Sequence, residues 1–306
     1  MSIISTAQAV PSRLFTIYSS LYDSSSGELK ERLESWATPP SLRTRGGTDE
    51  DGEAATSLFT NTLVEARKLG LVEEVGDKLR IPDAARSAAK KVADSKVPFR
   101  EHLVRILFDV EKAEEAQQSA FLLALSWFLT LNPLSPLGFA QPPQNQMREE
   151  LGEEYKRTEI TSLHRYQNFL YWARFLGFAT IVGGRDADDG KDSRWAFPDP
   201  IVAVSSALPI VFSKDKEIPI ETFLNRLSDI YPVFEGGTSR QELETMLRSP
   251  PPPDNRRISS ATSLALQRLH DRRSLKLISI ADAPVMIMHL GKQERRVSHI
   301  AKMDSL

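Results

Sequence analysis

One short pattern occurs twice in this chain and constrains the fold more than any other feature. Residues 66–75 read ARKLGLVEEV, and residues 173–182 read ARFLGFATIV. In both copies, apolar residues at helical spacing lead into a glycine, which favours the left-handed conformation that ends many helices. Both continue into a return strand and a Pro-Asp pair, as DKLRIPD at 77–83 and SRWAFPD at 193–199. The repeat predicts a helix followed by a β-hairpin, twice.

A helix, a glycine and a hairpin form the second half of a winged helix-turn-helix. The first half needs two more helices, and residues 13–22 and 27–36 each carry apolar side chains on one face. Gly76-Asp77, between two short mixed runs, is typical of a tight hairpin turn. The first copy is therefore predicted to be a complete winged helix.

A third and looser copy is predicted over residues 263–290, as a helix, a strand, a turn at 282–284 and a second strand. Two helices are expected before it, at 220–230 and 239–248, and LPIVF at 208–212 could add a strand beside the third hairpin. We therefore predict a mainly α fold with small β-hairpins, of the α+β class. It consists of three tandem winged helix-turn-helix domains joined by helices. The alternative is two winged helices followed by an unrelated α/β end.

The domain boundaries follow from these copies. Amphipathic patterns predict a connecting helix at 98–110 and the first helix of the second domain at 116–131. The three domains are expected at 1–95 (winged helix), 96–204 (connecting helix and winged helix) and 205–306 (winged helix with a basic C-terminal tail).

Three polar segments interrupt the copies, at 38–53, 249–255 and 183–192. The first two lengthen the turn before the third helix of their domains, which is unlike a compact repressor. DADDGKD at 186–192 resembles a calcium loop, but its Gly190 comes one place early and Phe197 stands where a bidentate glutamate belongs. We interpret it as a solvated wing tip.

Composition excludes several classes of protein. The chain has no cysteine, so it has no disulfide, thiol nucleophile or cysteine-bound zinc. It has no apolar run of membrane-spanning length and no secretory signal pattern, which fits a cytoplasmic location. Its formal net charge of -2 leaves room for only a local nucleic-acid-binding patch.

Catalytic motifs are absent as well. The sequence contains no glycine-rich phosphate loop, no HExxH and no GxSxG, and its five histidines lack metal-ligand spacing. We therefore expect no enzyme activity, no cofactor, no metal and no small-molecule ligand.

The third copy carries the most basic helix. Residues 254–276 contain six arginines and lysines against two aspartates, and the small polar side chains of Ser259, Ser263 and Gln267 share one helical face. Arginines beside small donors suit phosphate anchoring and contact with base edges. The predicted DNA-binding residues here are Arg256, Arg257, Ser259, Ser263, Gln267, Arg272, Arg273 and Lys276. A second basic cluster is expected in the tail, at Lys292, Arg295, Arg296, His299 and Lys302. The alternatives are an ordinary solvated helix and a surface for an acidic protein partner.

The other two copies offer less. The helix over 55–69 is balanced in charge and is predicted to be a packing helix. In the second copy, aromatic residues at helical spacing are expected in the core. Lys156, Arg157 and Arg165 remain as further candidate phosphate contacts.

We therefore expect a non-catalytic protein that grips double-stranded DNA through its third, and also its second, winged helix. One alternative is an adaptor that binds protein partners, as tandem winged helices do in accessory subunits of chromosome-organising complexes. Its supporting features are the balanced first domain, the aromatic second-copy helix and the apolar strand VMIMH at 285–289. A transcriptional regulator is a further alternative.

The opening MSIISTAQAVPSRL, followed by serial winged helices, resembles the DpdG-type proteins of bacterial deazapurine DNA-modification clusters. These proteins act in defence against foreign DNA. The resemblance implies a bacterial cytoplasmic protein that works beside other protein subunits of an antiviral defence system. It rests on architecture and on the opening segment, so it transfers no site residue to this chain.

Overall fold

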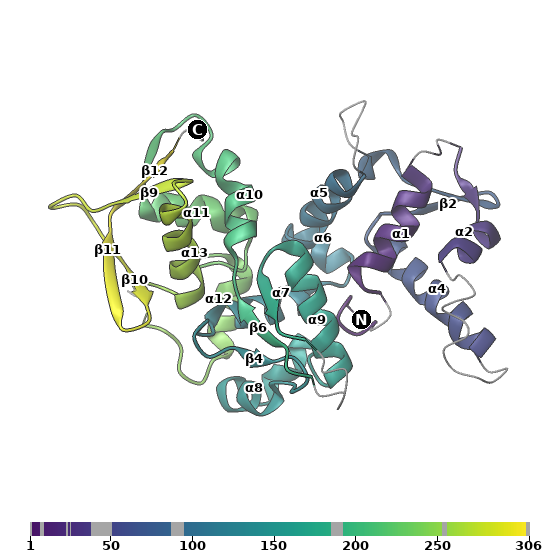
Figure 1. Cartoon of the computed structure of the whole chain (residues 1–306), viewed down its shortest axis with the longest axis horizontal. Coiled ribbons are helices and arrows are strands. Elements are labelled where there is room, and N and C mark those ends of the chain that lie inside the picture. Colours follow the sequence, from purple (N-terminus) through teal and green to yellow (C-terminus); the bar gives the residue numbers. More distant parts are fainter. Residues whose placement is uncertain are drawn as a thin grey trace.

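The chain is mainly helical, with four small sheets among the residues that the structure describes (Figure 1). The computed structural model describes residues 2–6, 9–22, 24, 26–37, 51–86, 95–184, 192–252 and 256–303, with 51–57 described by their backbone alone. Most of segment 38–53, the loop 185–191 and residues 253–255 therefore lie outside the described part, including the predicted wing tip except Asp192.

The first unit spans residues 11–80. Its elements are α1 (Pro11–Tyr22), β1 (Glu28–Leu29), α2 (Lys30–Ala37), α4 (Asp51–Lys68), β2 (Glu73–Val75) and β3 (Lys78–Arg80). The predicted hairpin is confirmed, because Glu73 pairs with Arg80 in an antiparallel register. Gly70 has the expected positive φ, of 61°. A short η1 (Asp83–Ala85), α5 (Lys96–Leu107) and α6 (Val110–Glu115) connect this unit to the next.

The second unit spans residues 119–198 and has the same order of helices and strands. Its elements are α7 (Ser119–Thr130), β4 (Leu137–Gly138), α8 (Gln144–Leu151), η2 (Gly152–Thr158), α9 (Leu163–Leu176), β5 (Ala179–Val182) and β6 (Trp195–Pro198). The predicted second hairpin is also confirmed, with Ala179 opposite Pro198. Its helix ends at Gly177, where φ is 90°.

The third unit spans residues 201–302 and differs from the prediction. Its elements are α10 (Ile201–Phe212), β7 (Glu217–Pro219), α11 (Ile220–Ile230), α12 (Thr238–Met246), β8 (Arg257–Ile258), α13 (Ser260–Asp271), β9 (Leu275–Ile278), β10 (Met286–Leu290), β11 (Gln293–Val297) and β12 (His299–Lys302). LPIVF at 208–212 is helical rather than extended, because it continues the apolar face of α10. The expected boundary at 204/205 falls inside this helix.

The predicted third hairpin is wrong. Strand β9 pairs with β12, with Ile278 opposite His299, and β10 pairs instead with β11 across a tight turn at Gly291. The segment expected to be a basic tail therefore forms β11 and β12. The hairpin β10–β11 and the short strand β8 make a separate sheet that lies beside α13, at the yellow end of the chain in Figure 1.

The three small sheets of the units share one strand order. They run β1-β3-β2, β4-β6-β5 and β7-β12-β9, so that in each sheet the last strand lies between the other two. Each first strand precedes the second helix of its unit, and it pairs with the last strand. The repeat read from the sequence is thus present three times at the level of strand order.

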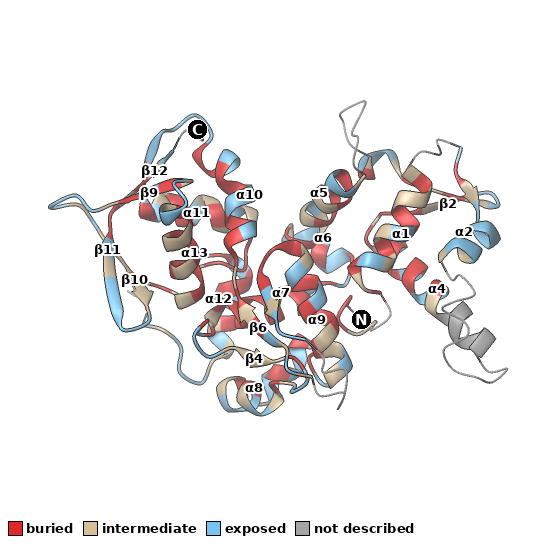
Figure 2. Cartoon of the chain, in the orientation of Figure 1, coloured by how far each residue is buried: buried red, intermediate tan, exposed pale blue. Residues whose placement is uncertain are grey.

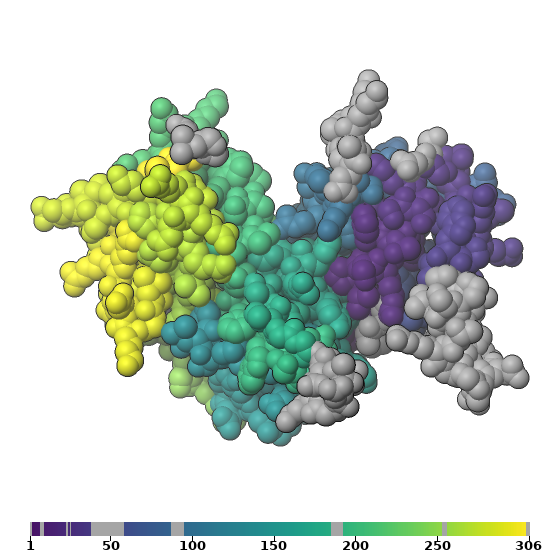
Figure 3. Space-filling model, in the orientation of Figure 1, coloured from purple at the N-terminus to yellow at the C-terminus, as the bar shows by residue number. Residues whose placement is uncertain are grey.

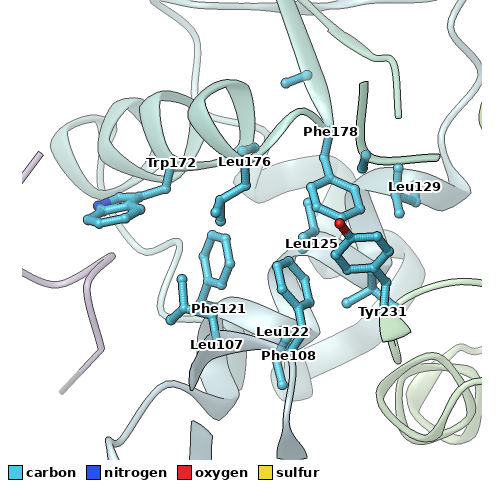
Figure 4. Packing of buried hydrophobic residues seen from close by; sticks show 14 of the residues in the cluster. Leu107, Phe108, Phe121, Leu122, Leu125, Leu129, Trp172, Leu176, Phe178 and Tyr231 are labelled. Carbon is cyan, nitrogen blue, oxygen red and sulfur yellow. The ribbon is translucent and has the colours of Figure 1, made fainter. Parts of the chain in front are cut away.

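A shared aromatic cluster joins the units. Phe108, which follows α5, packs 5.3 Å from Phe178 and edge-on to Tyr231 at 4.9 Å between ring centroids. Figure 4 shows these three rings beside apolar side chains of α7 and α9. Because Phe178 follows α9 and Tyr231 follows α11, burial of this cluster holds the connecting helices and the second and third units together.

The N-terminal segment, residues 2–6 and 9, packs against the second unit, which lies far along the chain. Ile3 and Ile4 are fully buried, and the side chain of Asn168 on α9 donates hydrogen bonds to the carbonyl groups of Ile3, Ile4 and Thr6. The Glu159 carboxylate accepts from the Ser2 amide and from the hydroxyls of Ser2 and Ser5. This segment therefore holds α9 in place, and Figure 1 shows the position of N beside that helix.

None of the helices described reaches the length and apolar character that crossing a membrane requires.

Candidate nucleic-acid interface

Helix α13, predicted to contact DNA, is covered on both sides. It packs against α10 on one side and against β9 and β10 on the other. Figure 2 shows most of its residues as buried or intermediate.

The serines of α13 are structural. Ser263 is fully buried, and its hydroxyl donates to the Ile258 carbonyl at 3.2 Å and accepts from the His289 amide at 3.0 Å. Ser259 is the N-cap, and its hydroxyl accepts from the Thr262 amide. The Ser263 hydroxyl, predicted to contact DNA, is therefore buried and bridges β8 and β10. Ser259 caps the N-terminal end of α13.

Two further predicted contacts in the third unit already have protein partners. Gln267 donates to Asp271 at 2.8 Å and accepts from Arg295 at 2.8 Å. Arg257 forms an ion pair with Glu294, at 2.9 Å. The Arg295–Gln267 bond joins α13 to β11, and the Arg257–Glu294 pair joins β8 to β11.

Four predicted cations remain at the surface of the third unit. Arg256, Arg272, Arg273 and Lys276 are all exposed. Arg272 and Arg273 follow the C-terminal end of α13, whereas Arg256 lies before β8 and Lys276 on β9. They therefore flank α13 and lie on three different segments of the third unit.

In the second unit, the predicted contacts separate into two kinds. Lys156 and Arg157 lie on η2 rather than on α9, and both are ion-paired: Lys156 with Glu153 at 2.6 Å, and Arg157 with Glu154 and with Glu242 of α12. Arg165 lies in the first turn of α9, where its guanidinium donates to the Thr161 hydroxyl. Of these three residues, only Arg165 lies on α9, the third helix of the second unit.

Helix α9 carries basic side chains and contains no aspartate or glutamate. Tyr166, Phe169 and Trp172 are buried, as the aromatic spacing predicted. Tyr171, predicted in the core with them, is instead 38% exposed. His164 and Arg174 are exposed as well, and within the described residues no carboxylate pairs with Arg174.

The C-terminal half of α9 borders a groove that the sequence analysis missed. The groove has a volume of about 700 Å³ and lies between α9, α1 and α5. In Figure 3 the purple residues of the first unit lie against the teal residues of the second. Four cationic and three aromatic side chains line it: Arg13, Lys96, Arg100, Arg174, Phe15, Tyr171 and Phe175. No aspartate or glutamate of the described chain is among its lining residues.

The groove side chains are held in place from the protein side. The Arg100 guanidinium donates to the Leu176 carbonyl at 3.0 Å. The Tyr171 ring packs 5.6 Å from the Phe139 ring. Arg194 is bonded to Asp192, and this bond, together with a smaller interaction with Tyr171, raises the pKa of Arg194 above the ordinary value. Burial lowers the pKa of Arg13 from its ordinary value, without removing its charge near neutral pH.

The groove could not have been found from sequence. Its cations come from three helices that are distant in the chain, and each helix alone shows only an ordinary surface arginine or lysine. Within the described residues, no group of three or more histidine, aspartate or glutamate side chains is arranged to hold a metal ion.

Comparison with known proteins places the chain in a family. The model of the DpdG-like family matches residues 1–283, from the N-terminal segment behind α9 to the loop after β9. No curated protein and no solved structure matches the chain. The match covers the N-terminal segment and both confirmed hairpins, so the resemblance drawn from the sequence is confirmed. The chain therefore belongs to the DpdG-like family, which suggests a role in a deazapurine DNA-modification cluster.

Proposed function

We propose that this protein is a non-catalytic DNA-binding subunit of a deazapurine DNA-modification and defence system, and that its three units are winged helices. The shared strand order supports the fold assignment, because each unit has a helix, a strand, further helices and a pair of strands that closes on the first strand. In the third unit, α12 and the β10–β11 hairpin are additions to this plan.

The observation that carries DNA binding is the charge of α9. This helix is the third helix of its unit, which in winged helices usually enters the major groove. It has three basic side chains, His164, Arg165 and Arg174, and no acidic one. The corresponding helix of the third unit, α13, is covered by the added hairpin. We therefore assign the duplex contact to the second unit, with His164 and Arg165 at the end that faces DNA.

A gel-shift titration with random-sequence duplex tests this assignment. The variant with His164→Glu and Arg165→Glu should lose most of its affinity, because two cations near phosphate are replaced by anions. The salt dependence of the remaining binding should be shallower, by about one unit of slope for each phosphate that the variant no longer neutralises. The matched control carries Arg272→Glu and Arg273→Glu, two exposed arginines of the third unit.

Three outcomes decide the matter. Loss of binding in the α9 variant alone supports the assignment. Loss in the control variant alone contradicts it and returns the contact to the third unit. Absence of any shift by the unmodified protein at low salt contradicts DNA binding as a whole.

An adaptor role has one specific observation in its favour. Val182 and Trp195 form a cross-strand pair on β5 and β6, and they are 52% and 48% exposed. Exposed apolar pairs of this kind are often protein contacts. The strand VMIMH, which the adaptor hypothesis used, is less available because Met288 is fully buried. Co-purification with the other cluster proteins, compared between the native chain and Trp195→Ser, tests this alternative.

A further inference from the structure

The groove between α1, α5 and α9 combines two features that single-stranded nucleic acid requires. Cations that follow the sugar–phosphate backbone and aromatic rings on which bases stack are the shared means of binding single strands. Here Arg100 and Arg174 provide the charge, and Tyr171 and Phe175 provide rings along the same wall. The volume of about 700 Å³ is in the range of clefts that hold small organic molecules.

We propose that this groove binds a single-stranded segment of DNA, with a base stacked on Tyr171 and phosphate groups bound by Arg100 and Arg174. This rests on the proposed function, and it adds a second, structurally separate contact to the duplex contact at the N-terminal end of α9. Double-stranded DNA is too wide to place its bases in such a groove, whereas an unpaired strand presents both bases and phosphates.

Arg100 is suited to phosphate because most of its donors remain. A guanidinium has five N–H donors, and one nitrogen of Arg100 is used to bond the Leu176 carbonyl. This bond holds the side chain in position at the groove wall. Arg13 and Lys96 already have interaction partners in the chain, so the proposal depends on Arg100, Arg174 and Tyr171.

Tyr171 is suited to stacking because its ring is held in place and still accessible. The ring packs 5.6 Å from the Phe139 ring, and 38% of the residue is exposed. A ring fixed in this way loses little further freedom when a base stacks on it. Phe175 packs 6.2 Å from Trp172 and 5.7 Å from Phe99, so the second ring is held in place as well.

Fluorescence anisotropy with a labelled oligothymidylate of about 12 nucleotides tests the proposal, since single-strand sites typically span about 4–16 nucleotides. The informative pair is Tyr171→Phe and Tyr171→Leu. Both lose the hydroxyl, but only the leucine variant loses the ring. We expect Tyr171→Phe to bind within about threefold of the native chain and Tyr171→Leu to bind about 5- to 100-fold more weakly, as loss of one stacked base implies.

The contribution of charge to oligonucleotide binding is tested with Arg174→Glu. The control is Arg272→Glu, which changes an exposed arginine outside the groove. Arg174→Glu should weaken binding of the oligonucleotide at low salt, and Arg272→Glu should not. Melting curves followed by circular dichroism check that each variant is folded. Equal affinities for Tyr171→Leu and Tyr171→Phe, or no effect of Arg174→Glu, would overturn the proposal.

The failure of this proposal and the failure of duplex binding are distinguishable. Duplex binding that is lost with His164→Glu and Arg165→Glu, in a protein that ignores the oligothymidylate, removes the groove proposal and keeps the function. Oligothymidylate binding that depends on Tyr171, without any duplex shift, keeps the groove and removes the duplex contact. A protein that binds neither probe removes both.

Discussion

The indole of Trp172, in the middle of α9, donates a hydrogen bond of 2.9 Å to the backbone carbonyl of Ala9, 163 residues away in the chain. Four residues earlier on the same helix, Asn168 donates to Thr6 at 3.0 Å. The face of α9 that carries Asn168 and Trp172 therefore holds the N-terminal segment. His164 and Arg165, which are assigned to DNA, lie one turn before Asn168, at i,i+4 and i,i+3 spacing to it. A contact through these two residues depends on a helix that this segment keeps in position.

The first prediction concerns Asn168. Its amide group binds the carbonyls of the N-terminal segment inside the protein. Asn168→Leu should lower the free energy of unfolding by about 1–3 kcal/mol, because these buried carbonyls lose their donor. Urea unfolding measures the change. The control is His164→Ala on the exposed face of the same helix, and an equally large loss in that variant would contradict the assigned role.

The second prediction concerns Glu159 and pH. Burial raises its pKa, but the hydrogen bonds from Ser2 and Ser5 outweigh this effect, and the net result is a pKa below the ordinary value. A carboxyl group with a lowered pKa in the folded state stabilises the fold fully above its unfolded pKa, near 4.3. That contribution is lost as the pH falls through the lower, folded value.

Glu159→Gln should therefore cost stability at neutral pH and lose part of the decline in stability on acidification. Thermal melts at a series of pH values between about 7 and 3 measure both effects. Glu153→Gln is the control, since Glu153 is an exposed carboxylate of the same segment. A parallel acid decline in the native chain and in Glu159→Gln would show that another group is responsible.

The third prediction concerns Gly177, where α9 ends. Its φ is 90°, and a Cβ at this position would lie 2.9 Å from the Cβ of Val202 on α10. Gly177→Ala should therefore cost both backbone strain and a steric clash, together about 2–4 kcal/mol. Gly76→Ala separates the cost of backbone strain from the cost of the steric clash. Gly76 has a φ of 65°, but no atom lies within 4 Å of the added Cβ, so it reports strain alone.

Adding Val202→Ala to Gly177→Ala should restore part of the lost stability, since the clashing side chain is shortened. Equal losses for Gly177→Ala and Gly76→Ala would mean that α9 and α10 separate without cost.

The fourth prediction concerns Ser263. Its buried hydroxyl bridges the Ile258 carbonyl and the His289 amide, so Ser263→Ala should lower the free energy of unfolding by about 1–3 kcal/mol. Affinity for duplex DNA should be unchanged in the folded variant. Calorimetry and gel shift measure the two quantities, with the exposed Ser205→Ala as the control. Weaker DNA binding by a stable Ser263→Ala protein would return α13 to the interface.

The helices and the first two hairpins could be predicted because their signals are local. Gly70 and Gly177 end their helices with positive φ, and the strands that follow pair with their nearest neighbours. The third hairpin failed because two pairings were locally reasonable. Strand β9 pairs with β12, although β10 and β11 lie between them in the sequence. No short pattern near Ile278 indicates a partner at His299.

The candidate site was less predictable than the fold. Ser263 lies on a helix face with other small polar residues, and that spacing does not reveal that β8 and β10 use its hydroxyl. In the same way, Arg100 and Arg174 line one groove only because α5 and α9 cross near α1. Long-range packing decides both cases, and a single sequence carries no direct record of it.

The β10–β11 hairpin of the third unit is inserted between two residues that lie side by side. The chain leaves β9 at Ile278 and returns at His299, and these two residues face each other across the ladder, with the Ser298 amide bonded to the Ile278 carbonyl at 2.9 Å. A segment with adjacent ends can be gained or lost without disturbing the register of the strands that flank it. The β10–β11 hairpin is thus an insertion whose loss would leave β9 and β12 paired, but it would also leave the Ser263 hydroxyl without the His289 amide that it bonds.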